Sequence, residues 1–271
     1  MATKNGGRRN RYAEIIGDIF VSKYKPGATE VAFERKEIVE KAAELGVDLP
    51  LNLGDVVYSF RYRTALPTEI RETAPADKEW VIRPVGQAKY SFSLTDVARF
   101  IPNMQLSETK IPDATPGIIT RYAMDDEQGL LAKVRYNRLI DIFTSVTCHS
   151  LQNHLRTTVQ NMGQVETDEI YVGVDKRGVH YIFPVQAKGG NDQLGVVQIE
   201  QDFALCREKF PGLVAIPVAT QFIDSDLIVM FSFEQDAKGK VRIAAERHYR
   251  LVEPNGVTAD DLNRYLARPT D

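Results

Sequence analysis

The chain has 271 residues, of which 43% are hydrophobic and 26% are charged, a composition typical of a soluble globular protein with one large or two modest domains. No apolar stretch is long enough to span a membrane and the start lacks an apolar signal-peptide core, so we expect no membrane association and a reducing, cytoplasmic location. The formal net charge of -3 argues against nucleic-acid binding over the whole surface, but not against a local basic patch.

The first part of the chain has the pattern of helices followed by strands. Apolar side chains recur at helical spacing in residues 11–24 and 29–45. Residues 52–63 mix the helical and strand periods, and indicate a third helix or a pair of strands. Residues 80–82 and 90–92 are typical of strands.

This order resembles a winged-helix domain. The resemblance implies DNA contacts from Arg61 and Arg63 on the third element and from Lys89 in the wing. The alternative is a helical unit whose arginines are solvated charges. Residues 102–116 are rich in Pro, Thr, Ser and Asp and are typical of a connector. We therefore expect an N-terminal recognition domain, mostly helical, over residues 1–115 and a second domain over residues 116–271.

The second domain has the pattern of a helix, strands, a helix and further strands. Helical spacing of apolar residues predicts a helix over 136–160 and another over 192–210, with Asn191 or Asp192 as N-cap. Alternating apolar residues indicate four strands, and turn residues join the first two of them. They are strands 165–172, 180–188, 213–219 and 227–233 and turn 175–178.

Polar side chains meet near the ends of the first two of these strands. Period-two alternation puts Glu166 and Asp168 on one face of their strand and Gln186 and Lys188 together on one face of the next. Carboxylates beside an amide oxygen and an ammonium make a site suited to a magnesium ion and a water molecule. Read singly, each of these residues is more typical of a solvated strand end than of a catalytic group.

The acidic strand, the turn and the strand ending in Gln186-Ala187-Lys188 resemble the restriction-endonuclease-like, or PD-(D/E)XK, nuclease superfamily, in its Mrr-like variant with Gln in place of the last acid. The resemblance covers residues 135–235 and implies an α/β fold with an αβββαβ core. It implies that Asp168 binds Mg²⁺ or Mn²⁺ directly, that Glu166 is a second ligand and that Gln186 adds a neutral oxygen. Lys188 would orient water or stabilise the charge on phosphate. Many members of this superfamily also carry an acid on the first helix of the core. Asp141 is the one acid within the helix predicted over 136–160.

We therefore expect a magnesium-dependent DNA endonuclease of restriction or phage-defence type. Its partner would be double-stranded DNA, and a homodimer is expected if both strands are cut, because each cut needs an active site. Two alternatives stay open. One is a non-catalytic DNA-binding regulator or defence adaptor on the same fold, and the other is a structure-specific repair or resolvase-like nuclease.

Overall fold

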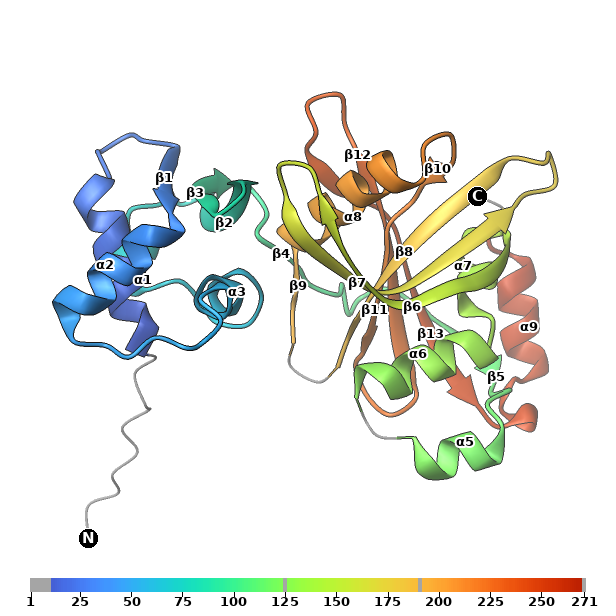
Figure 1. Ribbon diagram of the computed structural model, residues 1–271. Helices are drawn as coiled ribbons and strands as arrows, with labels where there is room; N and C mark the ends of the chain where they lie inside the picture. The colour runs from blue at the N-terminus through green and yellow to red at the C-terminus, as the bar shows by residue number, and fades with distance from the viewer. Residues whose placement is uncertain (1–10, 124–125, 190–191, 270–271) are drawn as a thin grey trace, which may run out of the picture. The chain divides into compact units, whose positions relative to one another are not determined.

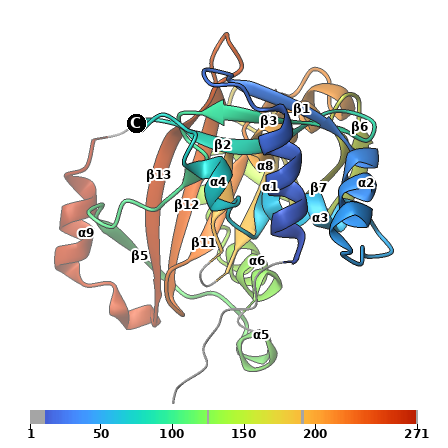
Figure 2. The same cartoon turned by 90° about the vertical axis from the view of Figure 1, so that its left-hand side faces the viewer.

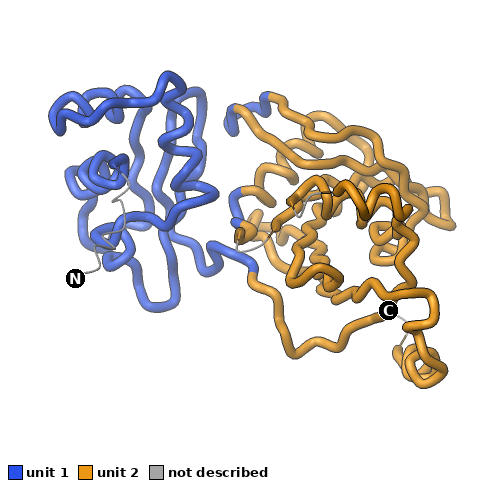
Figure 3. Tube along the Cα trace, turned by 90° about the horizontal axis from the view of Figure 1, so that it is seen from below, with its two compact units in different colours: residues 1–100, 158–163, 195–197 blue, residues 101–157, 164–194, 198–271 orange. Residues whose placement is uncertain are grey.

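The computed structural model describes residues 11–123, 126–189 and 192–269. The fold is mixed α/β. Residues 11–100, with Thr158–Gly163 and Gly195–Val197, pack as one compact unit, and the remaining described residues form a second (Figure 3). No helix within the described residues is long and apolar enough to cross a membrane.

The first unit combines helices with a three-stranded antiparallel sheet in the order β1-β3-β2 (Figure 2). Its elements in chain order are α1 (Arg11–Lys23), β1 (Glu30–Glu34), α2 (Arg35–Leu45), α3 (Gly54–Tyr62), α4 (Thr68–Arg71), β2 (Glu79–Gly86) and β3 (Lys89–Thr95). The predicted strands at 80–82 and 90–92 are confirmed, and the ambiguous segment 52–63 is a helix.

The helix predicted over 29–45 is wrong in its first part, which is strand β1. Val31 and Phe33 are buried while their neighbours face outward, so the segment has a strand period of two that precedes the helical period. Glu34 caps α2 in a capping box with Glu37, which fixes where the helix begins. The core is aromatic: Phe20 packs edge-on against Trp80 and Phe92, each at 5.1 Å.

The second unit is built on one large sheet whose strands run in the order β5-β13-β12-β11-β8-β7-β6, with β10 also paired to β8 (Figure 1). Strand β4 (Arg99–Phe100) ends the first stretch of the first unit. The elements that follow, up to β9, are β5 (Glu108–Pro112), α5 (Gly117–Tyr122), α6 (Glu127–Tyr136), α7 (Leu139–Thr144), β6 (Thr147–Val159), β7 (Gly163–Val174), β8 (His180–Lys188) and β9 (Leu194–Gly195). The later elements are α8 (Val196–Lys209), β10 (Val214–Ala215), β11 (Val218–Phe222), β12 (Leu227–Gln235), β13 (Val241–Val252), the 3₁₀ turn η1 (Pro254–Gly256) and α9 (Ala259–Leu266).

A crossover connects the two halves of this sheet. Strands β7 and β8 are antiparallel, α8 follows, and β11 then returns parallel to β8. One face of β8 packs against α6 and α7 through Phe183, Val185 and Ala187. The opposite face carries Gln186, which contacts Asp202 of α8. Helices therefore cover both faces of β8, as expected where parallel strands are joined by a helix.

The predicted strands 165–172, 180–188 and 227–233 are confirmed, and the helix predicted over 192–210 is α8. It begins later than expected, at Val196; the cap candidate Asn191 lies outside the described residues. Pro217 divides the run 213–219 into β10 and β11, because proline cannot donate to a strand ladder. The connector predicted over 102–116 contains β5, which pairs in parallel with β13.

The helix predicted over 136–160 is wrong, because only α7 is helical and β6 follows it. Arg138 and Ser145, with φ of 50° and 55°, adopt left-handed conformations at the two ends of α7. Strand β6 is at the sheet edge and is exposed along most of its length, so the apolar alternation that marks a half-buried strand is missing. Leu151, one of the apolar residues within the predicted helix, is 53% exposed.

Candidate functional site

The candidate site lies at the end of the β7–β8 pairing, where side-chain hydrogen bonds join the two strands. The paired residues run from Val174↔His180 to Glu169↔Val185. Just beyond, the carboxylate Oδ2 of Asp168 accepts a hydrogen bond from the backbone N of Ala187 at 2.8 Å, and Thr167 Oγ1 donates to the carbonyl of Val185 at 3.2 Å. The carboxylate of Asp168 is therefore held in place by the strand that carries Gln186 and Lys188.

Lys188 extends this cluster to α6. Its Nζ lies 3.0 Å from Oε1 of Glu127, and its side chain is only 13% exposed. Glu127 is the first residue of α6, after the N-cap Asp126, whose side chain accepts from Gly129 N at 2.9 Å. An acid is thus present on the helix that packs against β8, and it is Glu127 of α6.

Asp141, the candidate for that acid, has a structural role. It forms an ion pair with Arg138 and accepts a hydrogen bond from Cys148 N at 2.9 Å, which joins α7 to β6. The sequence analysis missed Glu127 because it began the helix at residue 136. The signal was present: Asp126-Glu127 precedes an apolar pair, Leu130 and Leu131, as expected at a helix start.

Gln186 is buried and contacts α8. Its Nε2 donates to both carboxylate oxygens of Asp202, at 3.1 and 3.0 Å, and reaches the carbonyl of Glu166 at 3.2 Å. Its Oε1 accepts from Gln198 Nε2 at 3.4 Å. The amide of Gln186 therefore holds Asp202, a residue that sequence reasoning missed. Its signal was an acid directly before the apolar run 203–206, on the buried side of a helix.

Burial and mutual repulsion set the electrostatics of this cluster. Burial raises the pKa of Asp168 above its ordinary value; the hydrogen bond from Ala187 and the charge of Lys188 oppose the rise, while Glu127 and Glu166 add to it. Asp202 is 1% exposed, and burial raises its pKa well above the ordinary value, with the charge of Asp168 adding to the rise. The carboxyl groups of Glu127, Asp168 and Asp202 thus outnumber the single ammonium of Lys188.

Glu166 is on the same side of β7 as Asp168, as the alternation predicted, but it is paired with β6. Its Oε2 accepts from Arg156 Nη2 at 2.9 Å, and its Oε1 lies 3.1 Å from His154 Nε2. The structure therefore brings Asp168, Gln186 and Lys188 together with Glu127 and Asp202. It directs the carboxylate of Glu166 toward the neighbouring strand.

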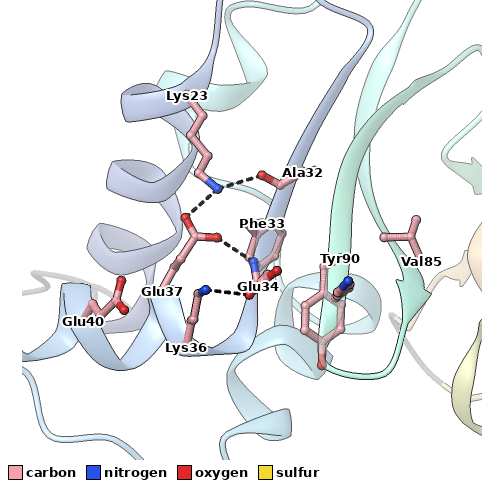
Figure 4. A pocket seen from close by; sticks show the side chains of 10 residues that line it. Lys23, Ala32, Phe33, Glu34, Lys36, Glu37, Glu40, Val85 and Tyr90 are labelled. Atoms are coloured by element: carbon pink, nitrogen blue, oxygen red, sulfur yellow. Dashed lines mark hydrogen bonds and ion pairs between the residues drawn. The ribbon is translucent and has the colours of Figure 1, made fainter.

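The predicted DNA contacts fall on two elements of the first unit. Arg61 belongs to α3 and Arg63 caps its end. Lys89, at the start of β3, lines a hollow of about 680 Å³ (Figure 4). The charged side chains of this hollow are Lys23, Glu34, Lys36, Glu37, Glu40 and Lys89. Because Lys23 pairs with Glu37 and Lys36 with Glu34, this surface is mixed in charge.

Within the described ranges, no three or more His, Cys, Asp or Glu side chains are arranged as a group that could hold a metal ion. Amide oxygens, or a pair of carboxylates completed by water and phosphate, can also hold a magnesium ion. Comparison of the chain with models of known protein families, with curated proteins and with solved structures found no match. The function must therefore be argued from the site.

Proposed function

We propose that the protein is a magnesium-dependent DNA endonuclease, of restriction or phage-defence type, that hydrolyses phosphodiester bonds. One observation carries the proposal: Asp168, Lys188 and Glu127 gather at the end of the β7–β8 pairing, with Ala187 N and Glu127 Oε1 as fixed partners. An acid and a lysine with partly buried, restrained side chains beside further carboxyl groups are costly for folding, and such clusters are concentrated at functional sites.

The topology supports the same proposal. A helix, three neighbouring strands β6, β7 and β8, the crossover helix α8 and the parallel strand β11 follow the αβββαβ order of a restriction-endonuclease-like core. In the first unit, the element order from α1 to β3 and the sheet order β1-β3-β2 are those expected of a winged helix, with Lys89 beside the β2–β3 wing. Fold resemblance raises the case for a nuclease without establishing it.

The charge of the cluster fits a divalent cation. Glu127 and Asp168 would hold Mg²⁺ or Mn²⁺ and leave positions for water and phosphate, since Mg²⁺ is usually bound by one or two carboxylates plus substrate oxygens. The ion would supply positive charge at the phosphate and lower the pKa of a bound water. Gln186 fits a supporting role better than a ligand role, because its amide is engaged by Asp202 and Gln198.

Each side chain then has a definable task. Asp168 is oriented by Ala187 N, so its carboxylate needs little reorganisation on binding. Lys188, now paired with Glu127, would donate to the phosphate or to the attacking water once the charge of Glu127 is shared with a cation. Gln186 and Asp202 join β8 to α8 and keep the strand end that carries Lys188 in position. Double-strand cutting would require two copies, and hence a homodimer.

Plasmid cleavage tests the proposal. The full chain is incubated with supercoiled DNA and Mg²⁺, Mn²⁺ or chelator, beside Asp168→Ala and Lys188→Ala variants. Asp175→Ala is the matched control, because Asp175 is also an acid hydrogen-bonded to backbone N–H groups, but it lies in the turn between β7 and β8. We expect metal-dependent cutting that falls by a factor of about 100 or more in both site variants and persists in the control. Cutting that survives both substitutions would reject the site.

A second function has its own observation. Lys188 is committed to Glu127 and position 186 is a neutral amide, which together favour a non-catalytic DNA-binding regulator or defence adaptor on this fold. Such a protein would bind duplex DNA in a salt-dependent way. It would not cut the DNA, whichever divalent metal is added. The same plasmid assay, read beside a binding assay, separates the two functions.

A further inference from the structure

Helix α3 carries a cluster of two tyrosines and two arginines, which we name the Arg–Tyr cluster: Tyr58, Arg61, Tyr62 and Arg63. The rings of Tyr58 and Tyr62 meet edge to face with centroids 4.7 Å apart. The guanidinium carbon of Arg61 lies 4.8 Å from the centroid of Tyr62, and that of Arg63 lies 5.2 Å from the centroid of Tyr58. Each ring is therefore paired with one cation.

The core of the unit fixes this cluster on the outer side of the helix. Val56, Val57 and Phe60 of α3 are buried in the core of the unit. Tyr58, by contrast, is 37% exposed. Because residues three and four apart share a helix face, Tyr58, Arg61 and Tyr62 form one surface, and the exposed Arg63 follows at the helix end. A rigid helix thus presents aromatic and guanidinium planes together.

The cations of the cluster lack anionic partners in the described part of the chain. Neither Arg61 nor Arg63 forms an ion pair there, and Nε and Nη2 of Arg61 are closed off from solvent without a hydrogen-bond acceptor. The acid on the same helix, Asp55, accepts a hydrogen bond from Asn52 instead. No acid of the described chain therefore neutralises the charges of these two guanidinium groups.

We propose that the Arg–Tyr cluster of α3 binds unpaired nucleobases of single-stranded DNA, by stacking them on the tyrosine and guanidinium planes while the two charges attract the backbone. Two features favour this ligand over duplex phosphates. Arginine planes and tyrosine rings stack on bases, whereas phosphate contacts need only charge. The cluster holds as many rings as charges. The inference rests on the nucleic-acid-binding part of the proposed function and not on hydrolysis.

Fluorescence anisotropy on the full chain in chelator tests this. Three labelled ligands of about twelve nucleotides, within the span of a single-strand site, are compared: oligothymidylate, an abasic strand of equal charge, and a duplex. Oligothymidylate should bind about ten times more tightly than the abasic strand, because stacking is worth that much per base. The duplex, with its bases already paired, should bind less tightly than oligothymidylate.

Substitutions separate stacking from charge. Tyr58→Ala should weaken oligothymidylate binding about fivefold or more, whereas Tyr58→Phe keeps the ring and should retain it. Arg63→Lys keeps the charge but loses the plane, and should weaken binding as well. Arg121→Ala is the matched control. The guanidinium carbon of Arg121 lies 5.6 Å from the ring centroid of Tyr122, in an exposed pair on α5 of the second unit. Circular dichroism melting checks that each variant folds.

The outcomes divide cleanly. Equal affinity for the abasic strand and oligothymidylate, or unchanged affinity in Tyr58→Ala, overturns the proposal and leaves a phosphate contact only. Tightest binding to the duplex overturns it too, in favour of groove recognition by α3. Failure of plasmid cleavage alone leaves this inference standing, since binding in chelator needs neither Asp168 nor a metal ion. Absence of binding to all three ligands rejects it together with DNA binding by this unit.

Discussion

Lys188 at the end of β8 and Glu127 at the start of α6 form an ion pair of 3.0 Å between residues 61 positions apart. The pair places a cation and an acid from different elements next to Asp168, whose carboxylate is bonded to the residue before Lys188. A strand end, a helix start and a neighbouring strand therefore meet at one point of the unit. Four substitutions, at Glu127, Asp168, Gln186 and Asp202, test this cluster, and one at Gly173 tests the contact between β6 and β7.

Glu127→Ala removes the acid that holds Lys188. We expect cleavage to fall about a hundredfold, as for loss of one group that stabilises the reacting charges. The free energy of unfolding should fall by only about 1 kcal/mol or less, because Glu127 is 37% exposed and solvent screens such pairs. Rates of plasmid nicking and urea unfolding measure the two effects.

Glu208→Ala is the control for that variant. Glu208 is 36% exposed and pairs with Lys209 at 2.7 Å, but on the last turn of α8. Its loss should leave cleavage unchanged. If Glu127→Ala and Glu208→Ala nick DNA at the parent rate, Glu127 has no part in the chemistry.

Asp168→Asn should stabilise the fold at neutral pH while abolishing cleavage. Folding raises the pKa of Asp168 above its ordinary 3.8, mainly through burial. As the pH rises, the carboxyl of residue 168 therefore ionises first in the unfolded chain. The ionised carboxylate lowers the free energy of unfolding; this loss is complete above the folded-state pKa and absent below 3.8. Asparagine keeps an oxygen for Ala187 N without the charge.

We expect a gain on the order of 1 kcal/mol near pH 7, as is usual when a functional site is relieved of strain. The gain should shrink as the pH falls toward the ordinary pKa of the carboxyl. Urea unfolding of parent and variant at several pH values measures it. A variant less stable than the parent near pH 7 would show that Asp168 is a net stabilising partner of Lys188.

Much of the fold was predictable where burial leaves a periodic signal. In β7, β8, α8 and β12, apolar residues recur at the period of the strand or helix, because each element has at least one face in the core. The same signal gave Asp168, Gln186 and Lys188 their common position. What these side chains contact was not predictable, because Glu127 and Asp202 come from elements whose approach depends on tertiary packing.

The errors have physical causes as well. Strand β6 is an edge strand with both faces largely exposed, so its apolar residues at positions 151 and 155 matched a helical spacing by chance. Strand β1 is followed directly by α2, with Glu34 as both strand end and N-cap, and the two periods merged into one apparent helix. Strand β5 is short and partly exposed, with polar residues typical of a connector.

Gly173→Ala tests the corrected position of β6. A Cβ at Gly173 would lie 2.7 Å from Val146 Cγ1, 2.9 Å from Cys148 Sγ and 3.0 Å from the carbonyl of Thr147. These contacts are too close, so the β6–β7 pair must shift, at a cost of about 2 kcal/mol. Gly117→Ala is the control, because its Cβ would meet no atom within 4 Å. Equal thermal stability of the two variants would contradict the packing of β6 on β7.

The contact between Gln186 and Asp202 can be tested by exchanging the amide and the carboxylate between the two positions. Gln186→Glu places a second carboxylate about 3 Å from Asp202, next to Asp168. Because burial already raises the pKa of Asp202, two buried acids in contact should lower the free energy of unfolding by about 3 kcal/mol. The loss should be largest at high pH and fall as acid protonates one of the two. Urea unfolding measures both.

Adding Asp202→Asn to Gln186→Glu restores one amide and one carboxylate in contact, with their positions exchanged between β8 and α8. We expect the double variant to recover most of the lost stability, a coupling of about 2 kcal/mol in a double-mutant cycle. Asp202→Asn alone leaves two amides, which can still bond, and should cost less than Gln186→Glu. If the two substitutions are additive, the hydrogen bonds between Gln186 and Asp202 do not hold β8 to α8, and the supporting role assigned to Gln186 is lost.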